Sequence, residues 1–183
     1  MLRRIAALRS VAVGFNPRTA KQNNTRRGAT IDPMANTFFS LHYHIVFSTK
    51  QRQRLLHGET KPRVLAYLGG IARENEAKPI CLGGMEDHVH LLVEIPPKHA
   101  VSKLVQQIKG GSSKWIHETF AGLHAFAWQD GYSVFSVSKS AVPEVIRYIE
   151  NQEEHHRQKT FEEELRLLLE RHGIAYDERY SLD

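Results

Sequence analysis

The sequence predicts a mixed α+β domain in which helices pack on an antiparallel sheet. Two stretches, residues 39–48 and 87–95, alternate apolar side chains with others, as half-buried strands do. Several other stretches repeat apolar residues every three to four positions, the spacing of a helix with one buried face. A chain of 183 residues suits one such domain with additional segments.

The positive charge of the chain is concentrated at its start. The first 31 residues carry seven Lys and Arg side chains and no acidic one. Subtracting these seven from the total of 25 leaves 18 basic against 20 acidic side chains, a net charge of −2 for residues 32–183. The net charge therefore does not indicate nucleic-acid binding by the folded part.

Three interpretations of this leader, residues 1–36, stay open. One is an arm that binds nucleic acid, the second is an organelle transit peptide, and the third is upstream sequence translated from a misplaced start. We favour a disordered segment with Met34 as the true initiator. The single cysteine fits a reducing compartment. No apolar run approaches the roughly 18 residues of a membrane helix, so we expect a cytoplasmic protein without a membrane partner.

The first half of the folded part reads as β-α-β-β. The strand at 39–48 is followed by a basic loop, and residues 60–76 form the first helix. Residues 78–83 form a short strand. The Gly83-Gly84 pair then allows a turn into the strand at 87–95.

The second half adds a helix and a strand. Residues 100–109 form the second helix, which Gly110-Gly111 interrupt and Ser112 restarts as a cap. Residues 132–137 form the last strand.

Two more helices end the chain. The first starts near Pro143, because proline suits the first turn, and runs to about Gln158. The second starts at a capping box formed by Thr160 and Glu163. We expect the acidic run that follows Thr160 to be a solvated helix start.

The complete order, β-α-β-β-α-β followed by two helices, is the ferredoxin-like split βαβ pattern. In this topology helices cover one face of an antiparallel sheet, and the first and third strands are neighbours. The apolar sides of both strands would face the helices. Four histidines would then lie together on the open face: His42, His44, His88 and His90.

The pair His88 and His90 is a candidate metal site. Two residues apart on one strand face, the imidazoles lie about 7 Å apart at Cα and can converge on one divalent ion. From the motif alone, a pair of half-exposed strand histidines without a metal is the favoured interpretation. A histidine-triad nucleotide hydrolase needs a third histidine at position 92, where this chain has Leu92.

A late helix offers a nucleophile for that site. Tyr148, Asn151, Gln152 and His155 have the spacing of one polar helix face. Tyrosine can act as a covalent nucleophile. Its pKa of about 10 makes it weak at neutral pH unless a cation assists. The Gln152 amide oxygen can complete the ligand set, and oxygen beside imidazole suits Mg²⁺ or Mn²⁺ as well as a softer ion.

These residues resemble the single-tyrosine HUH transposases of the insertion sequence 200/605 type. They also resemble the domesticated relatives associated with repetitive extragenic palindromes (REP). The motif His88-Val89-His90 on a strand and Tyr148 with Gln152 on a late helix carry the resemblance. It extends over about residues 38–180, and the basic leader has no counterpart. Further similar segments are 44–50, 102–109, 135–138 and 148–156.

The resemblance implies a DNA nickase and ligase with its catalytic domain at 37–160 and a C-terminal helix and tail at 161–183. Tyr148 would attack single-stranded DNA, keep the 5′ phosphate as a phosphotyrosine and release a 3′-OH. His88, His90 and Gln152 would hold Mg²⁺ or Mn²⁺. Members act as homodimers on single-stranded DNA with hairpin ends, often with each tyrosine helix completing the partner's site.

Basic side chains in two clusters are candidates for phosphate contacts, although a solubilising surface explains them as well. Two other functions compete with the active transposase. One is a non-catalytic single-stranded nucleic-acid-binding module on the ferredoxin-like sheet, and the other is a domesticated enzyme that cleaves but no longer moves an element. The candidate contacts are Lys50, Arg52 and Arg54 after the first strand, and Lys109 and Lys114 on or after the second helix.

Overall fold

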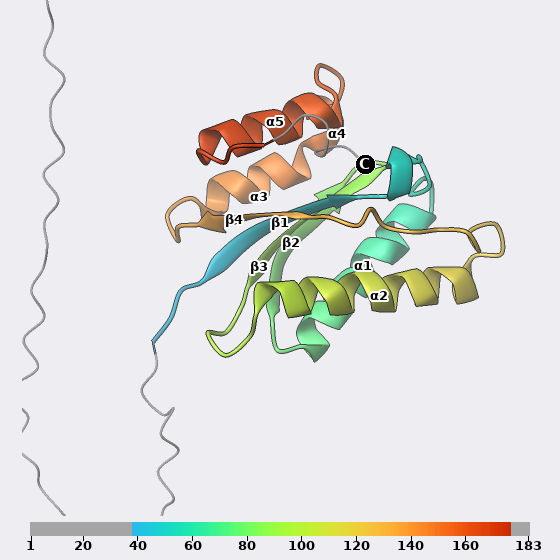
Figure 1. The fold of residues 1–183 in the computed structure, drawn as a ribbon, viewed down its shortest axis with the longest axis horizontal. Helices are drawn as coiled ribbons and strands as arrows, with labels where there is room; N and C mark the ends of the chain where they lie inside the picture. The colour runs from blue at the N-terminus through green and yellow to red at the C-terminus, as the bar shows by residue number, and fades with distance from the viewer. Residues whose placement is uncertain (1–37, 177–183) are drawn as a thin grey trace, which may run out of the picture. The chain divides into compact units, whose positions relative to one another are not determined.

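The computed structural model describes residues 38–176, which form a four-stranded antiparallel sheet with helices on both faces (Figure 1). The predicted leader at 1–36 and the last seven residues of the predicted tail lie outside the described residues. Within residues 38–176, no helix is both long and apolar enough to cross a membrane.

The sheet has the strand order β2-β3-β1-β4, and all neighbouring strands are antiparallel. This confirms the ferredoxin-like prediction, including the central pairing of β1 with β3. Their register places Val46 opposite His90 and Ser48 opposite His88. The strands are β1 (His42–Ser48), β2 (Lys78–Gly84), β3 (His88–Glu94) and β4 (Ser133–Val137).

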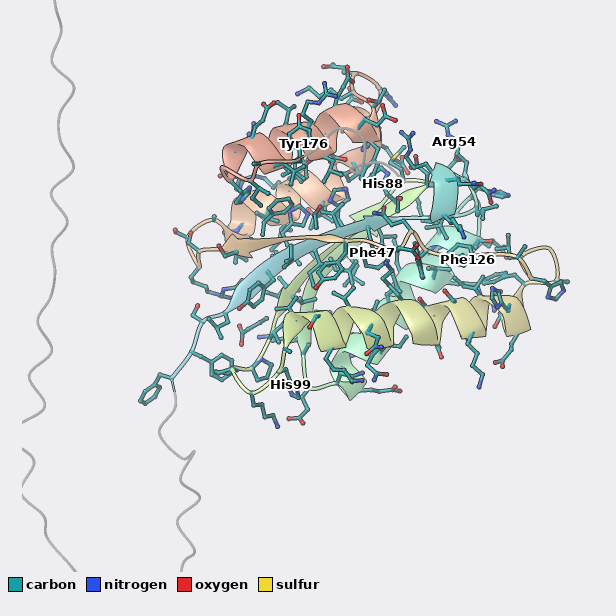
Figure 2. The ribbon with its side chains drawn as sticks, in the orientation of Figure 1. Phe47, Arg54, His88, His99, Phe126 and Tyr176 are labelled. Atoms are coloured by element: carbon teal, nitrogen blue, oxygen red, sulfur yellow. The ribbon has the colours of Figure 1, made fainter. Side chains whose placement is uncertain are left out.

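The first face of the sheet is covered by α1 (Thr60–Glu74) and α2 (Val101–Thr119) (Figure 1). It carries the odd-numbered side chains of β1 and β3, such as Phe47 and Leu91, as the alternation predicts. Figure 2 shows Phe47 on this side, toward α2. Helix side chains that complete this core include Leu68, Leu104 and Ile108.

Helix α2 is continuous, so the predicted interruption at Gly110-Gly111 is wrong. A Cβ on Gly111 would lie 3.1 Å from the Cδ1 atom of Ile71 in α1. The missing side chain therefore serves close packing between α1 and α2, and the packing offsets the low helix propensity of glycine.

The second face of the sheet is covered by α3 (Val142–Glu150), α4 (Gln152–His155) and α5 (Phe161–Arg171) (Figure 1). The prediction of an open histidine face is therefore wrong. The four histidines do share this face, but each is at most 3% exposed. Apolar side chains between them, above all Val46 and Leu92, pack against the C-terminal helices: Val142 and Ile149 from α3, and Phe161, Leu165, Leu168 and Leu169 from α5.

The C-terminal helices differ from the prediction at one point. The helix expected from Pro143 to about Gln158 breaks at Asn151, so Tyr148 belongs to α3 and Gln152 begins α4. The capping box is confirmed, because the Thr160 hydroxyl accepts from the Glu163 backbone N–H and the Glu163 carboxylate accepts from the Thr160 N–H.

Helix α3 approaches β2 closely at one glycine. A Cβ on Gly83 would lie 2.7 Å from the Cγ2 atom of Ile149 and 2.8 Å from its carbonyl oxygen. Because the backbone of α3 itself is in the way, no rotamer change can make room. Gly83 therefore sets the position of the helix that carries Tyr148.

We expect Gly83→Ala to lower the free energy of unfolding by roughly 1–3 kcal/mol, the usual cost of overpacking. Urea unfolding measures this. Gly70→Ala in α1 is the control, because nothing lies within 4 Å of the added methyl group. It should keep or raise stability, since alanine favours helix over glycine by roughly 0.5–1 kcal/mol. Equal effects of the two substitutions would contradict the close approach.

Candidate active site around His88 and His90

Each imidazole of the His88/His90 pair is held through its Nδ1 atom. Nδ1 of His88 lies 2.7 Å from a carboxylate oxygen of Asp87, and Nδ1 of His90 lies 2.9 Å from Nε2 of His44. Both rings are fully buried. The Nε2 atoms therefore turn toward the C-terminal helices, and Nε2 of His90 has no hydrogen-bond partner.

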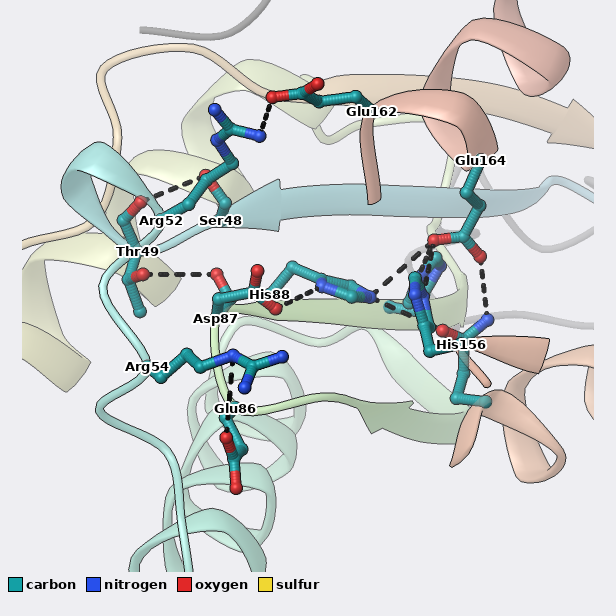
Figure 3. Close-up of polar contacts among 12 residues, drawn as sticks. Ser48, Thr49, Arg52, Arg54, Glu86, Asp87, His88, His156, Glu162 and Glu164 are labelled. Carbon is teal, nitrogen blue, oxygen red and sulfur yellow. Dashed lines mark hydrogen bonds and ion pairs between the residues drawn. The ribbon is translucent and has the colours of Figure 1, made fainter. Parts of the chain in front are cut away.

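A carboxylate from α5 faces both of these nitrogens. The Oε2 atom of Glu164 lies 3.6 Å from Nε2 of His88 and 3.5 Å from Nε2 of His90. The same oxygen lies 3.0 Å from Nε2 of His156. Figure 3 shows Glu164 reaching down from its helix between His88 and His156. Only 1% of Glu164 is exposed.

The second oxygen of this carboxylate binds the predicted catalytic residues. Oε1 of Glu164 accepts hydrogen bonds from the Tyr148 hydroxyl and from the Gln152 amide, the latter at 2.8 Å. The amide oxygen of Gln152 lies 3.4 Å from Nε2 of His88. Glu164 thus connects the tyrosine to the histidine pair within one chain.

The electrostatics favour neutral imidazoles at His44 and His90 and a charged carboxylate at Glu164. Burial and the neighbouring His90 lower the pKa of His44 to about 3. Burial likewise lowers the pKa of His90. Although burial opposes it, the pKa of the Glu164 carboxyl stays far below its usual range because of the His156 and His90 side chains. Burial, followed by the charge of Glu164, raises the pKa of Tyr148, which therefore carries a proton.

The donor atoms of this site fit a divalent cation. Two ligands of one ion, each bound at about 2.1 Å, lie about 3.0–3.4 Å apart. The separations of Nε2 of His88 from the Gln152 amide oxygen and from Oε2 of Glu164 are close to this range, at 3.4 and 3.6 Å. The unpartnered Nε2 of His90 faces the same space. One nitrogen each from His88 and His156 and an oxygen of Glu164 lie within 4.8 Å of one another.

Three hollows surround the site and give it access to solvent. Tyr148, which is half-buried, lines two of them, with volumes of about 420 and 590 Å³. The larger one also includes Asn151 and His155. A third, of about 440 Å³, borders Asp87 and His156. A long substrate can therefore reach the Tyr148 ring and the Asp87 and His156 side chains, which flank His88.

The structure brings four of the predicted site residues together: Tyr148, His88, His90 and Gln152. The other two residues of the predicted polar helix face are not buried, since Asn151 is exposed and His155 is partly exposed. The remaining strand histidine, His42, lies apart and pairs with Glu94 at 3.3 Å.

Sequence reasoning missed Glu164, which it assigned to a solvated helix start. A signal existed in the spacing of α5. Phe161, Leu165 and Leu168 are buried, and Glu164 occupies a position on the same stripe. A charged residue inside an apolar stripe is buried with it and therefore needs polar partners.

Of the two predicted basic clusters, only the first contributes side chains to one of the three hollows. Arg52 and Arg54 help to line the third hollow, where they pair with Glu162 and Glu86. Lys109 lies on α2, and its ammonium donates to carbonyl oxygens of residues 129–131. The last two candidates, Lys50 and Lys114, are exposed.

We expect Tyr148→Phe to lower the free energy of unfolding by roughly 1–3 kcal/mol, because it removes a hydrogen bond to a buried charge. Urea unfolding of Tyr132→Phe provides the control, since Tyr132 is an exposed aromatic residue and should lose little. A Tyr148→Phe protein as stable as the unmodified chain would show that the bond to Glu164 contributes nothing.

Comparison with known proteins places these residues in context. Residues 37–152 match the family model described as "Transposase IS200 like". The ISDra2 transposase TnpA of Deinococcus radiodurans is 29% identical over 119 residues, which cover 62% of this chain and 85% of the relative. The transposase for insertion sequence element IS200 of Salmonella typhimurium is 32% identical over 124 residues, covering 65% of this chain and 81% of the relative.

Solved structures show the same similarity. A crystal structure of a putative transposase from Deinococcus radiodurans R1 has a TM-score of 0.52 and 28% identity, covering 70% of this chain and 98% of that one. A REP-associated tyrosine transposase bound to a REP hairpin has a TM-score of 0.50 and 15% identity, covering 66% of this chain and 72% of that one. The second similarity concerns the fold alone.

Proposed function

Because this chain belongs to the IS200-like transposase family, we propose that it cleaves and rejoins single-stranded DNA through Tyr148. In this proposal His88, His90 and Gln152 hold a divalent cation. One observation carries it: the Tyr148 hydroxyl, the Gln152 amide and the Nε2 atoms of both histidines converge on one buried carboxylate of the same chain.

The proposed reaction is an exchange of phosphodiester bonds. The Tyr148 oxygen forms a bond to a DNA phosphorus and loses its proton, while the bond from that phosphorus to the 3′ oxygen breaks. The products are a 5′-phosphotyrosine and a free 3′-OH. When a 3′-OH attacks the same linkage, the phosphodiester is restored and the tyrosine released. No nucleotide cofactor is required, because the covalent link conserves the bond energy.

The chain's own residues orient the reacting groups. Glu164 accepts the hydrogen bond of the Tyr148 hydroxyl and so points it toward the histidine pair. Asp87 and His44 fix the two imidazoles through their Nδ1 atoms, which leaves both Nε2 atoms available as ligands. When bound, Mg²⁺ or Mn²⁺ would polarise the phosphate and stabilise its developing charge.

Within a single chain, the tyrosine already lies beside the histidine pair. The ring centroids of Tyr148 and His90 lie 5.9 Å apart within one protomer. We therefore propose that each tyrosine acts beside its own histidine pair. The homodimer implied by the family resemblance remains a prediction, and cleavage would not require it to exchange tyrosine helices.

The proposed substrate is single-stranded DNA next to a hairpin. One solved structure with a similar fold is a transposase bound to a REP hairpin. In this chain, Arg52 and Arg54 at the third hollow lie beside the site, where they can contact phosphates. Lys109 and Lys114 lie on α2, which covers the opposite face of the sheet, so we assign them no contact with the cleaved strand.

We expect a covalent protein–DNA adduct when the full chain is incubated with hairpin-bearing single-stranded DNA and Mn²⁺. A denaturing gel detects it. Tyr148→Phe should abolish the adduct because the attacking oxygen is missing, whereas the control Tyr132→Phe should retain it. Binding of DNA without any adduct would instead favour the non-catalytic module.

We also expect His88→Ala to reduce cleavage at least a hundredfold while DNA affinity changes less than threefold. The reason is that loss of one imidazole removes a cation ligand but no phosphate contact. Cleavage gels and fluorescence anisotropy measure the two effects, and His124→Ala at an exposed position is the control. Cleavage at an unchanged rate in His88→Ala would refute the assignment of the cation to this pair.

A further inference from the structure

We propose that Glu164 is a further ligand of the cation, so that helix α5 completes the metal site. This inference rests on the proposed function, because it takes the cation to be held by His88 and His90. It adds a carboxylate ligand from outside residues 37–152, the segment that matches the family model.

The distances favour a shared ion over direct hydrogen bonds. Oε2 of Glu164 lies 3.5 Å from Nε2 of His90, which is buried and has no hydrogen-bond partner. It lies 3.6 Å from Nε2 of His88. Both separations are long for a hydrogen bond to a carboxylate. They are close to the spacing of two atoms that bind one ion.

The charge of the other proposed ligands also favours a carboxylate as a ligand of the cation. Without Glu164, the proposed ligands are two imidazoles and an amide oxygen, none of which carries a negative charge when it binds a cation. Mg²⁺ and Mn²⁺ prefer oxygen ligands, and carboxylates above all. Glu164 is also the buried acidic residue nearest both imidazoles among the described residues. Its cost of burial would fall once a cation neutralises it.

The position of Glu164 is fixed by the helix that carries it. The Thr160–Glu163 capping box starts α5 one turn ahead, and Phe161 and Leu165 on either side are buried against the sheet. His156 donates to the same oxygen from the α4–α5 connection, and we regard it as a positioning residue. The carboxylate therefore does not have to be drawn in from solvent to reach an ion.

Manganese binding to the full chain provides the test, because free Mn²⁺ is measured directly by electron paramagnetic resonance. The unmodified chain should bind one Mn²⁺ that His88→Ala loses. Glu164→Gln should weaken this binding at least tenfold, because the amide keeps the shape but not the charge. Glu170→Gln, at an exposed position of the same helix, should stay within twofold.

A second measurement needs no substitution at position 164. Mn²⁺ should slow amide hydrogen exchange in α5 if Glu164 binds the ion, because the ion then ties the helix to β3. Faster exchange on adding Mn²⁺ would mean that the ion displaces the carboxylate, and it would overturn the inference.

The outcomes distinguish a failure of the Glu164 inference from a failure of the proposed cation site. Mn²⁺ affinity that is unchanged in a folded Glu164→Gln chain but lost in His88→Ala refutes the Glu164 ligand and leaves the proposed cation site intact. The absence of any His88-dependent Mn²⁺ site in the unmodified chain refutes the cation site, and the Glu164 ligand with it.

Discussion

The Glu164 carboxylate contacts side chains from four separate segments, and the second face of the sheet is organised around it. Burying an ionised carboxylate is costly unless hydrogen bonds and opposite charges compensate. Here the partners come from β3, α3, α4 and the connection to α5. Each of these segments is therefore oriented toward the same point. This one requirement brings a tyrosine, an amide and two imidazoles within reach of each other.

Strand alternation and register determine the rest of the arrangement. Because β1 and β3 are adjacent and antiparallel, His44 lies close enough to His90 to hold its Nδ1 atom. Asp87, which directly precedes β3, holds His88 in the same way. Both imidazoles therefore present the same ring atom to the C-terminal helices. A shift of one residue in the register of either strand would turn its histidines toward the core under α1 and α2.

The sequence was sufficient to predict the sheet and to select the residues that the structure brings together, but not to predict that the C-terminal helices cover them. Alternation around Ile45 and Leu91 distinguishes the two faces of each strand, and the order of elements then selects the topology. An apolar helix stripe shows that a helix is buried but not against which surface, so the docking of Leu165 on the histidine face could not be foreseen. Gly111 was misread for the same reason, since its role depends on Ile71 in another helix. A prediction of the role of Glu164 would have required knowing its partners, which lie up to 76 positions earlier in the chain.

The cover that α5 provides has a practical consequence for expression of shorter forms of the protein. A fragment that stops at residue 152, where the family match ends, would keep every strand but uncover Val46 and Phe135. These side chains would meet water, and the imidazoles beneath would lose their buried surroundings. Such a fragment should aggregate rather than behave as a minimal enzyme, because the boundary drawn by sequence similarity is shorter than the unit that folds.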